Sequence, residues 1–318
     1  MKDIVKPSDD KRVLVIGNGF DLDLGWNTRF SDFASSKYWP QNRHKGSILE
    51  YLTRRRQVTD WFDIEKEIGD FASGNDIKCH TLSSIQINKA YFEALVNGFK
   101  SYLLEEIQKP IKKDSTASIV LSEILKNQQF SSIYSFNYTD LYEISRSLNI
   151  VSPFAYEHVH GALKTNDMIL GAPEDKELNK GYEYLYKTFN EHYQSNELIY
   201  DLTDAKEVVF FGHSLGPTDY HYFRSFFQTQ CQECLQRADA KKITLFTYDD
   251  NARISILRQL RTMNDKKTSL LVNKNDFKVF MTKDGVTPEI ESFLEHLRLT
   301  SLEAHGKMLQ RAVSFFRQ

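Results

Sequence analysis

The chain has 318 residues, 41% of them hydrophobic, and its 41 basic and 43 acidic residues leave a formal net charge of -2. This balance excludes a generally cationic nucleic-acid binder, and the 22 Phe and 16 Tyr exclude a disordered chain. Three cysteines are too few for a secreted disulfide framework, and we find neither a signal peptide nor an apolar run long enough to span a membrane, so we expect a cytoplasmic protein with no membrane partner.

Apolar bursts without polar alternation recur along the whole chain. Such bursts are typical of strands that are buried on both faces of a parallel sheet, and the first predicts a strand over Val13 to Ile16. Helical patterns lie between most bursts, as in residues 139–150, 218–236 and 250–263. We therefore predict one α/β domain over residues 1–318, with a Rossmann-like parallel sheet. The bursts cover residues 12–20, 131–137, 157–161, 167–171, 207–214, 242–248 and 277–281.

Residues 40–128 differ from the rest of the chain in the spacing of their apolar residues. Good helix formers recur there at helical spacing and no Pro- or Gly-rich linker interrupts them, which predicts a helical insertion between the first and second strand units. Two amphipathic segments at the C-terminus, residues 288–300 and 301–318, predict helices that cover a sheet edge or form contacts in a homo-oligomer.

A short glycine turn, Gly17-Asn18-Gly19, directly follows the first predicted strand. This is the place of a phosphate-binding turn, where glycine lets the chain reverse and a ligand approach the backbone closely. The helix that follows would offer N–H groups to a phosphate. Leu22 stands in place of the third glycine of the dinucleotide motif, so a tight turn with a purely structural role is the alternative.

Polar side chains follow four of the later bursts. Because ligands collect beyond the carboxyl ends of parallel strands, we expect these side chains to line one pocket. Asn137 has an alternative role as a helix N-cap, and His158 with His160 form an alternative metal site, although no third ligand is evident. The four groups are Ser135-Phe136-Asn137-Tyr138, His158-Val159-His160-Gly161, Gly171-Ala172-Pro173-Glu174 and Gly212-His213-Ser214-Leu215-Gly216, with Asp219 close behind the last.

Two further motifs have alternative interpretations. The spacing of Gly212, Ser214 and Gly216 is that of a nucleophile elbow, which would make Ser214 the nucleophile of a hydrolase, but Pro217 stands where the helix of an elbow begins. The CxxC motif at residues 231–234 supplies too few ligands for a structural zinc site. We expect two reduced thiols there rather than a redox pair, and no bound metal.

Six segments together resemble the AbiH family of bacterial phage abortive-infection proteins. The order and spacing of the segments over residues 12–225 carry the resemblance, rather than any one motif. The resemblance implies a bacterial defence protein. The segments are GNGFDLDLGWNTRFSDF, WFDIEKEIGDFA, SFNYTDLYE, HVHG, ILGAPED and FFGHSLGPTDYHYF.

A more distant resemblance is to sirtuin-like NAD-binding domains. Asn137 matches their asparagine and His160 matches the histidine of their His-Gly pair, which is the base, whereas Asn18 and Thr139 replace their usual Ala and Asp. Deacetylases of this class carry a four-cysteine zinc module, which three scattered cysteines cannot form, so a deacetylase is not expected. The other matching positions are Gly17, Gly19, Gly25, Gly212, Ser214 and Asp219.

The second resemblance implies that NAD is the ligand and that its nicotinamide–ribose bond is cleaved. This reaction needs no strong acid because the leaving group is already a cationic pyridinium. His160 would accept the proton, since a neutral imidazole can do so at cellular pH, and Asn137 would orient ribose hydroxyls or the attacking water. The implied nucleotide-binding residues are Gly17, Asn18, Gly19, Phe20, Asp21, Ser135, Gly212, Ser214 and Asp219.

Two other functions stay open at this point. A sensor that binds a nucleotide without turnover would use the same pocket, and a nuclease or other nucleotide hydrolase would use Asp21, Asp23 and the histidines. The basic triplet at residues 54–56 lies in a helical pattern, where a solvated helix face is the simpler interpretation. We therefore expect a small nucleotide, and not a nucleic acid, as the partner.

Overall fold

The structure is a computed structural model that describes residues 11–41, 44–57, 63–77, 80–127 and 130–299. Six parallel strands form one sheet in the order β3-β2-β1-β4-β5-β6, which confirms the predicted α/β fold with a parallel sheet. The strands are β1 (Arg12–Ile16), β2 (Ser132–Ser135), β3 (Glu157–His158), β4 (Glu207–Phe211), β5 (Lys242–Thr247) and β6 (Asp276–Met281).

Strands β1 and β4 lie side by side in the middle of the sheet. The chain first builds outward from β1 to β2 and β3, then returns to the other side of β1 and builds outward from β4 to β6. The crevice outside the carboxyl ends of the strands at such a reversal is where open α/β sheets bind their ligands. Ile16 pairs with Phe211, so β1 and β4 end at the same level and the turns that follow them meet.

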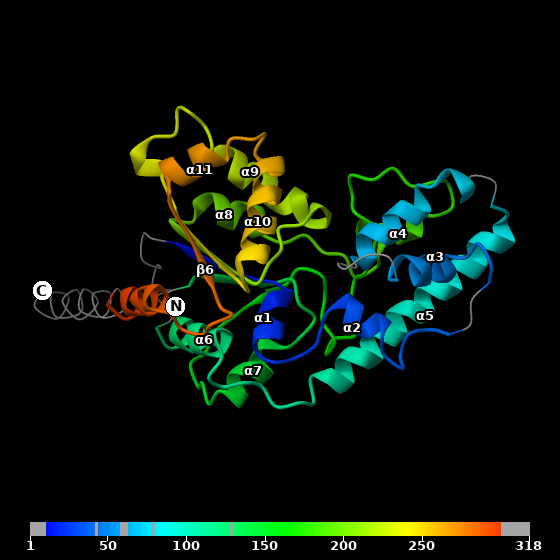
Figure 1. The fold of residues 1–318 in the computed structure, drawn as a ribbon, viewed down its shortest axis with the longest axis horizontal. Coiled ribbons are helices and arrows are strands. Elements are labelled where there is room, and N and C mark those ends of the chain that lie inside the picture. The colour runs from blue at the N-terminus through cyan, green and yellow to red at the C-terminus, as the bar shows by residue number, and fades with distance from the viewer. Residues whose placement is uncertain (1–10, 42–43, 58–62, 78–79, 128–129, 300–318) are drawn as a thin grey trace, which may run out of the picture.

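Helices cover both faces of the sheet (Figure 1). Val13 and Val15 face one layer while Leu14 and Ile16 face the other, which explains why this burst lacks polar alternation. One layer holds α8 (Leu198–Asp204), α9 (Tyr220–Thr229), α10 (Asp250–Met263) and α11 (Thr268–Lys274). The other holds α1 (Asn18–Asp23), α6 (Thr116–Asn127), α7 (Leu141–Ser147) and the helical residues 288–299.

A third group of helices has a core of its own beside the sheet, at the right of Figure 1. We call it the helical body. Ser47, Asp63 and Thr81 accept backbone N–H groups at the starts of its three longer helices, as N-caps do. It consists of α2 (Phe30–Ala34), α3 (Ile48–Arg55), α4 (Ile64–Ala72), α5 (Leu82–Glu106) and the segment 163–185.

The interval predicted as an insertion, residues 40–128, is helical where it is described, but its helices divide between two cores. Helices α3 to α5 belong to the helical body, whereas α6 packs on the sheet through side chains that include Ala117 and Leu121. Helix α6 is therefore the crossover helix that leads from β1 back to β2. The helical body is the part that stands apart from the sheet.

One predicted strand is wrong. Residues 167–171 form no strand, although Met168 and Leu170 are buried. Both side chains pack into the core of the helical body, and the backbone of Ile169 bonds to two separate partners: its N–H donates to the His160 carbonyl at 2.8 Å, and its carbonyl accepts from the Tyr138 hydroxyl at 3.0 Å. The apolar burst reflects burial against the helical body and not membership of the sheet.

The helix predicted to run through residues 218–236 is too long. Helix α9 ends at Thr229, and the Asn275 side chain donates to the carbonyl of the next residue, Gln230, at 3.0 Å, which satisfies one of the free carbonyls at the helix end. Cys231 and Cys234 follow in a turn and are both free thiols, one buried and the other exposed.

At the C-terminus, the predicted helix over residues 288–300 is observed over residues 288–299, and the one over residues 301–318 lies outside the described residues. Across the ranges that the structure describes, no helix combines the length and the apolar character needed to cross a membrane.

Candidate functional site

The glycine turn after β1 packs directly against the turn after β4. A Cβ atom on Gly17 would lie 2.5 Å from the Cα atom of His213, and one on Gly19 would lie 2.7 Å from that of Gly212. The Gly17 N–H donates to the Phe211 carbonyl at 2.9 Å and the Gly19 N–H to the Gly212 carbonyl at 2.8 Å. Two N–H groups that a phosphate would use are therefore bonded to β4 and its turn.

Asp21 lies behind this turn in α1 and is buried. Its carboxylate accepts a hydrogen bond of 2.8 Å from the Asn137 amide, and each of its oxygens lies 3.1 Å from the Thr139 hydroxyl. The Asn137 amide also donates to the Gly17 carbonyl at 3.1 Å, and the Asn137 N–H donates to the Ser135 hydroxyl at 3.2 Å. Because every partner is neutral, burial dominates and raises the pKa of Asp21 to about 7.

His160 follows β3, and its ring meets Asp219 in the short helix that leads into α9. The Nε2 atom of His160 lies 3.1 Å from Oδ1 of Asp219. Gly161 has a φ of +70°, and a Cβ atom there would lie 2.0 Å from the Asp167 carbonyl oxygen, so only glycine fits after this histidine. The His160 backbone is thus fixed by its neighbours while its side chain reaches the segment before α9.

Three residues outside the predicted site complete this cluster. The Lys187 ammonium lies 2.8 Å from Oε2 of Glu65, 3.3 Å from Nε2 of His160 and 3.5 Å from Oδ1 of Asp219. His213, in the turn after β4, places its Nε2 atom 3.7 Å from Oδ2 of Asp219. We call these five residues the buried polar network. It joins α4 of the helical body, through Glu65, to the carboxyl rim of the sheet.

The charges in the network are set by burial and by one strong ion pair. Burial lowers the pKa of His160 and of His213 to about 4, so both rings are neutral at neutral pH. Burial acts to raise the pKa of Asp219, but the nearby Lys187 charge holds it well below its usual range. Burial likewise opposes the Lys187 charge, yet the Glu65 and Asp219 carboxylates raise the pKa of this lysine above its usual range.

Glu65 is the member of the network closest to its titration point. Burial raises its pKa to about 7, against the opposing effect of the Lys187 charge. Its Oε1 atom and the Nδ1 atom of His160 are both buried, and neither has a hydrogen-bond partner among the described residues. Buried polar atoms without a partner are rare in folded proteins and require an explanation, such as a polar ligand or a water molecule.

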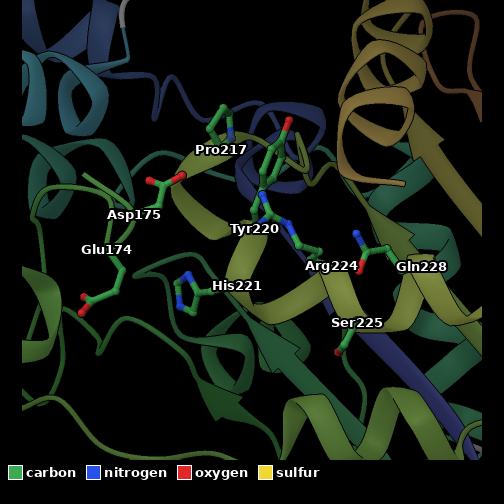
Figure 2. A pocket seen from close by; sticks show the side chains of 8 residues that line it. All are labelled: Glu174, Asp175, Pro217, Tyr220, His221, Arg224, Ser225 and Gln228. Carbon is green, nitrogen blue, oxygen red and sulfur yellow. The ribbon is translucent and has the colours of Figure 1, made fainter. Parts of the chain in front are cut away.

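A pocket of about 280 Å³ opens beside the network, along the start of α9. Figure 2 shows Glu174 and Asp175 on one side of it and side chains of α9, among them Arg224, on the other. His221, two residues after Asp219, also lines the pocket. None of the four strand-end residues Gly19, Asn137, His160 and Ser214 lies on its wall.

Ser214 does not have the surroundings of an activated nucleophile. It is exposed, and no hydrogen bond joins it to a histidine within the described part of the chain. The residues with positive φ in this turn are Gly212, at +67°, and Leu215, at +51°, and the short helix begins at Pro217. The turn therefore lacks the serine-centred geometry that defines a nucleophile elbow.

The remaining candidates have structural partners. Asp140, and not Asn137, is the N-cap of α7, since its carboxylate accepts the Tyr142 N–H at 2.8 Å. Asp23 accepts the Ala117 N–H at 2.7 Å at the start of α6, so its carboxylate lies away from that of Asp21. Within the described residues, no group of three or more His, Cys, Asp or Glu side chains is arranged to hold a metal ion.

The basic triplet at residues 54–56 is paired with its neighbours. Arg54 forms an ion pair with Glu50 at 2.6 Å, and Arg55 donates to both oxygens of Glu67 at 2.8 and 3.0 Å. The Arg56 guanidinium lies over the Trp39 ring at 5.2 Å. These residues stabilise the helical body and its surface.

The structure thus divides the predicted site residues into two groups at the same rim. Asn137, Ser135 and Asp21 gather behind the glycine turn, whereas His160 and Asp219 meet in the buried polar network. Glu65 and Lys187 were not predicted, and His213 was expected only as one member of the polar group after the burst at residues 207–214. Glu65 lies within WFDIEKEIGDFA, one of the six segments of the family resemblance, and His213 stands between Gly212 and Ser214, but no motif marks Lys187.

Comparison with known proteins identifies the family. A family model described as "Bacteriophage abortive infection AbiH" matches residues 13–236, and the chain belongs to this family, as its sequence segments predicted. No curated protein sequence matches the chain.

Two solved structures are similar in fold, each at 11% sequence identity. One is a crystal structure of a Sir2 homologue in complex with NAD; the alignment covers 92% of the present chain and 90% of the homologue, with a TM-score of 0.41. The other is described as the structural basis for the mechanism and regulation of Sir2 enzymes; the alignment covers 82% of the present chain and 93% of the other, with a TM-score of 0.32. Similarity at this level does not indicate what the present chain binds.

Proposed function

We propose that this member of the AbiH family acts in abortive infection by cleaving the nicotinamide–ribose bond of NAD, with His160 as the general base. The observation that carries the proposal is the 3.1 Å contact between His160 Nε2 and Asp219 Oδ1 at the carboxyl rim of the sheet. A neutral imidazole held by an ionised carboxylate can take up a proton, and the carboxylate stabilises the imidazolium that forms.

In the proposed reaction, water attacks the ribose carbon as nicotinamide leaves with the electrons of the broken bond. The attacking water loses a proton to His160, which later releases it to solvent, so the products are nicotinamide, ADP-ribose and one proton. Positioned proton transfer of this kind contributes on the order of 10²–10⁴ in rate. Asn137 is proposed to orient the water or the ribose hydroxyls through its side-chain oxygen, Oδ1, since its side-chain nitrogen, Nδ2, is bonded to Gly17 and Asp21.

Two buried atoms support a polar ligand at this place. The Nδ1 atom of His160 and the Oε1 atom of Glu65 lack partners, and both can accept a hydrogen bond from a hydroxyl group or a water. Gly17 and Gly19 would contribute by close approach rather than by hydrogen bonds, because their N–H groups are bonded to carbonyls. The nucleotide-binding role of Asn18, Phe20, Asp21, Ser135, Gly212 and Ser214 is part of the same proposal.

The direct test is to incubate the purified protein with NAD and measure free nicotinamide and ADP-ribose by chromatography. We expect both products in equal amounts from the wild type, with and without EDTA. His160→Ala should lose activity by a factor of about 10²–10⁴. His192→Ala is the matched control, because the His192 side chain is 45% exposed and lies outside the network.

Two outcomes would replace this function with another. Tight binding of NAD without product in the wild type would indicate a nucleotide sensor. Turnover of a nucleotide that disappears in EDTA would indicate a metal-dependent hydrolase. Equal rates for His160→Ala and wild type would show that this histidine has a structural role only.

A further inference from the structure

His160 Nε2 has two neighbours whose hydrogen bonds exclude each other. The Asp219 carboxylate, at 3.1 Å, can only accept, so this contact requires a proton on Nε2. The Lys187 ammonium, at 3.3 Å, can only donate, so this contact requires a lone pair on Nε2. A neutral imidazole can satisfy one of them at a time. Whichever of these two hydrogen bonds forms determines which ring nitrogen of His160 carries the proton.

Glu65 bears on that competition because it is the nearest partner of the lysine. Lys187 Nζ lies 2.8 Å from Glu65 Oε2, closer than to His160 at 3.3 Å or to Asp219 at 3.5 Å. The lysine and glutamate side chains are 5% and 10% exposed, so water screens their attraction little. A charge-assisted bond of this length holds the ammonium towards α4 and leaves His160 Nε2 to Asp219.

We propose that Glu65 is a positioning residue for His160: by holding Lys187, it keeps the His160 proton on Nε2 and leaves Nδ1 free to act as the base. The proposal rests on the function proposed above for His160. Nδ1 is the ring nitrogen that has no partner in the structure, which is the state expected of a base that waits for its substrate. In the other tautomer Nδ1 would carry the proton and could not accept one.

The proposal gives the helical body a part in the chemistry. Glu65 is the second residue of α4, whereas His160 and Asp219 belong to the rim of the sheet. A displacement of α4 from the rim would release Lys187 to His160 and would move the proton to Nδ1. The tautomer of one histidine therefore depends on how the helical body sits against the sheet.

The tautomer can be measured without any substrate. In protein labelled with ¹⁵N-histidine, the unprotonated ring nitrogen resonates far downfield of the protonated one, and His160→Ala assigns the signal. We expect the wild type at about pH 9, where Glu65 with its pKa of about 7 is ionised, to carry the His160 proton on Nε2. In Glu65→Gln, which removes the negative charge but keeps the shape, we expect the proton on Nδ1 in most molecules.

A double variant and a control make the test selective. Lys187→Met removes the competing donor, so Glu65→Gln combined with Lys187→Met should return the proton to Nε2. In this double variant Asp219 also loses its ion pair with Lys187, so the folding of each variant is checked by circular dichroism before the tautomer is compared. Glu67→Gln removes another buried carboxylate of α4, one that binds Arg55, and should keep the wild-type tautomer.

Activity supplies a second measurement. A wrong tautomer in an Asp-His pair can cost on the order of 10⁴ in rate, so we expect Glu65→Gln to cleave NAD about 10²–10⁴-fold more slowly and the double variant to recover part of that loss. A proton on Nδ1 in the wild type, or on Nε2 in Glu65→Gln, would overturn the positioning role. Absence of NAD cleavage with the expected tautomers would overturn the proposed substrate alone.

Discussion

Two aspartates at the carboxyl rim of the same sheet, Asp21 buried and Asp219 largely buried, have opposite protonation behaviour. Asp21 accepts from the Asn137 amide and the Thr139 hydroxyl, both neutral, and its pKa is raised to about 7 by burial. Asp219 faces the Lys187 ammonium and two histidines, and its pKa stays well below the usual range although burial opposes this. Burial is common to both residues, so the charge of the partners makes the difference.

The comparison separates a cluster whose partners are neutral from one that contains an ion pair. The Asp21 cluster bonds to the glycine turn and ties β1 to β2. The Asp219 cluster keeps an ionised carboxylate beside a neutral imidazole and leaves the other nitrogen of that ring unpaired. Three predictions test the contrast, in order of decreasing effect.

Substitution of Asp219 should have the largest effect. Asp219→Asn leaves the Lys187 ammonium with one carboxylate fewer in a buried site, and breaking a buried ion pair on one side costs about 3–5 kcal/mol of unfolding free energy. Urea unfolding followed by circular dichroism measures this loss. Asp70→Asn is the control, since its ion pairs with Lys66 and Lys176 are partly exposed and each is worth about 1 kcal/mol or less. Equal losses of unfolding free energy for the two variants would show that the pairing of Asp219 with Lys187 stabilises the protein no more than a surface ion pair does.

Asp21 should make the protein less stable as the pH rises. Its folded pKa of about 7 lies above the unfolded value of ~3.9, so the folded state binds more protons between these values and stability falls as the pH increases through this window. One such group loses on the order of 3 kcal/mol between about pH 5 and about pH 8. Glu65, with a pKa of about 7, changes stability in the same direction.

Asp21→Asn cannot titrate and should therefore flatten part of this dependence. Urea unfolding of both proteins at the two pH values gives the comparison. The slope that remains combines the loss of stability from Glu65 with an opposite contribution of His160 and His213, whose lowered pKa of about 4 makes stability rise with pH below about 6.5. A variant as sensitive to pH as the wild type would show that Asp21 is ionised throughout.

The glycine turn should give the smallest effect. A methyl group in Gly17→Ala would meet the Cα atom of His213 at 2.5 Å, and relief of such overpacking costs about 1–3 kcal/mol of unfolding free energy. Gly216→Ala is the matched control at the same rim, because the nearest atom is the Ser214 hydroxyl at 3.3 Å, at the end of a side chain that can turn away. Its cost should stay within about 0.5 kcal/mol. An unaltered stability of Gly17→Ala would mean that the two turns do not pack as described.

Most of the fold could be predicted because its signals are local. Six of the seven apolar bursts form strands, and the central strands β1, β4 and β5 are buried on both faces, which requires an unbroken apolar run. The burst at residues 167–171 was wrongly predicted to be a strand, because burial against the helical body requires the same apolar residues as burial in a sheet. Likewise, helical periodicity cannot reveal that the end of α9 bonds to Asn275, which lies 45 residues after Gln230 in the chain.

For the candidate site, the sequence by itself determined which polar residues stand at strand ends, because a short polar motif directly after an apolar run is visible along the chain. It therefore pointed to His160, Asn137 and Asp219. Only the tertiary structure decided their partners. Lys187 and Glu65 lie 122 residues apart in the chain yet form an ion pair. The electrostatic effect of this pair on His160 depends on distances of 3 to 4 Å, which no local pattern encodes.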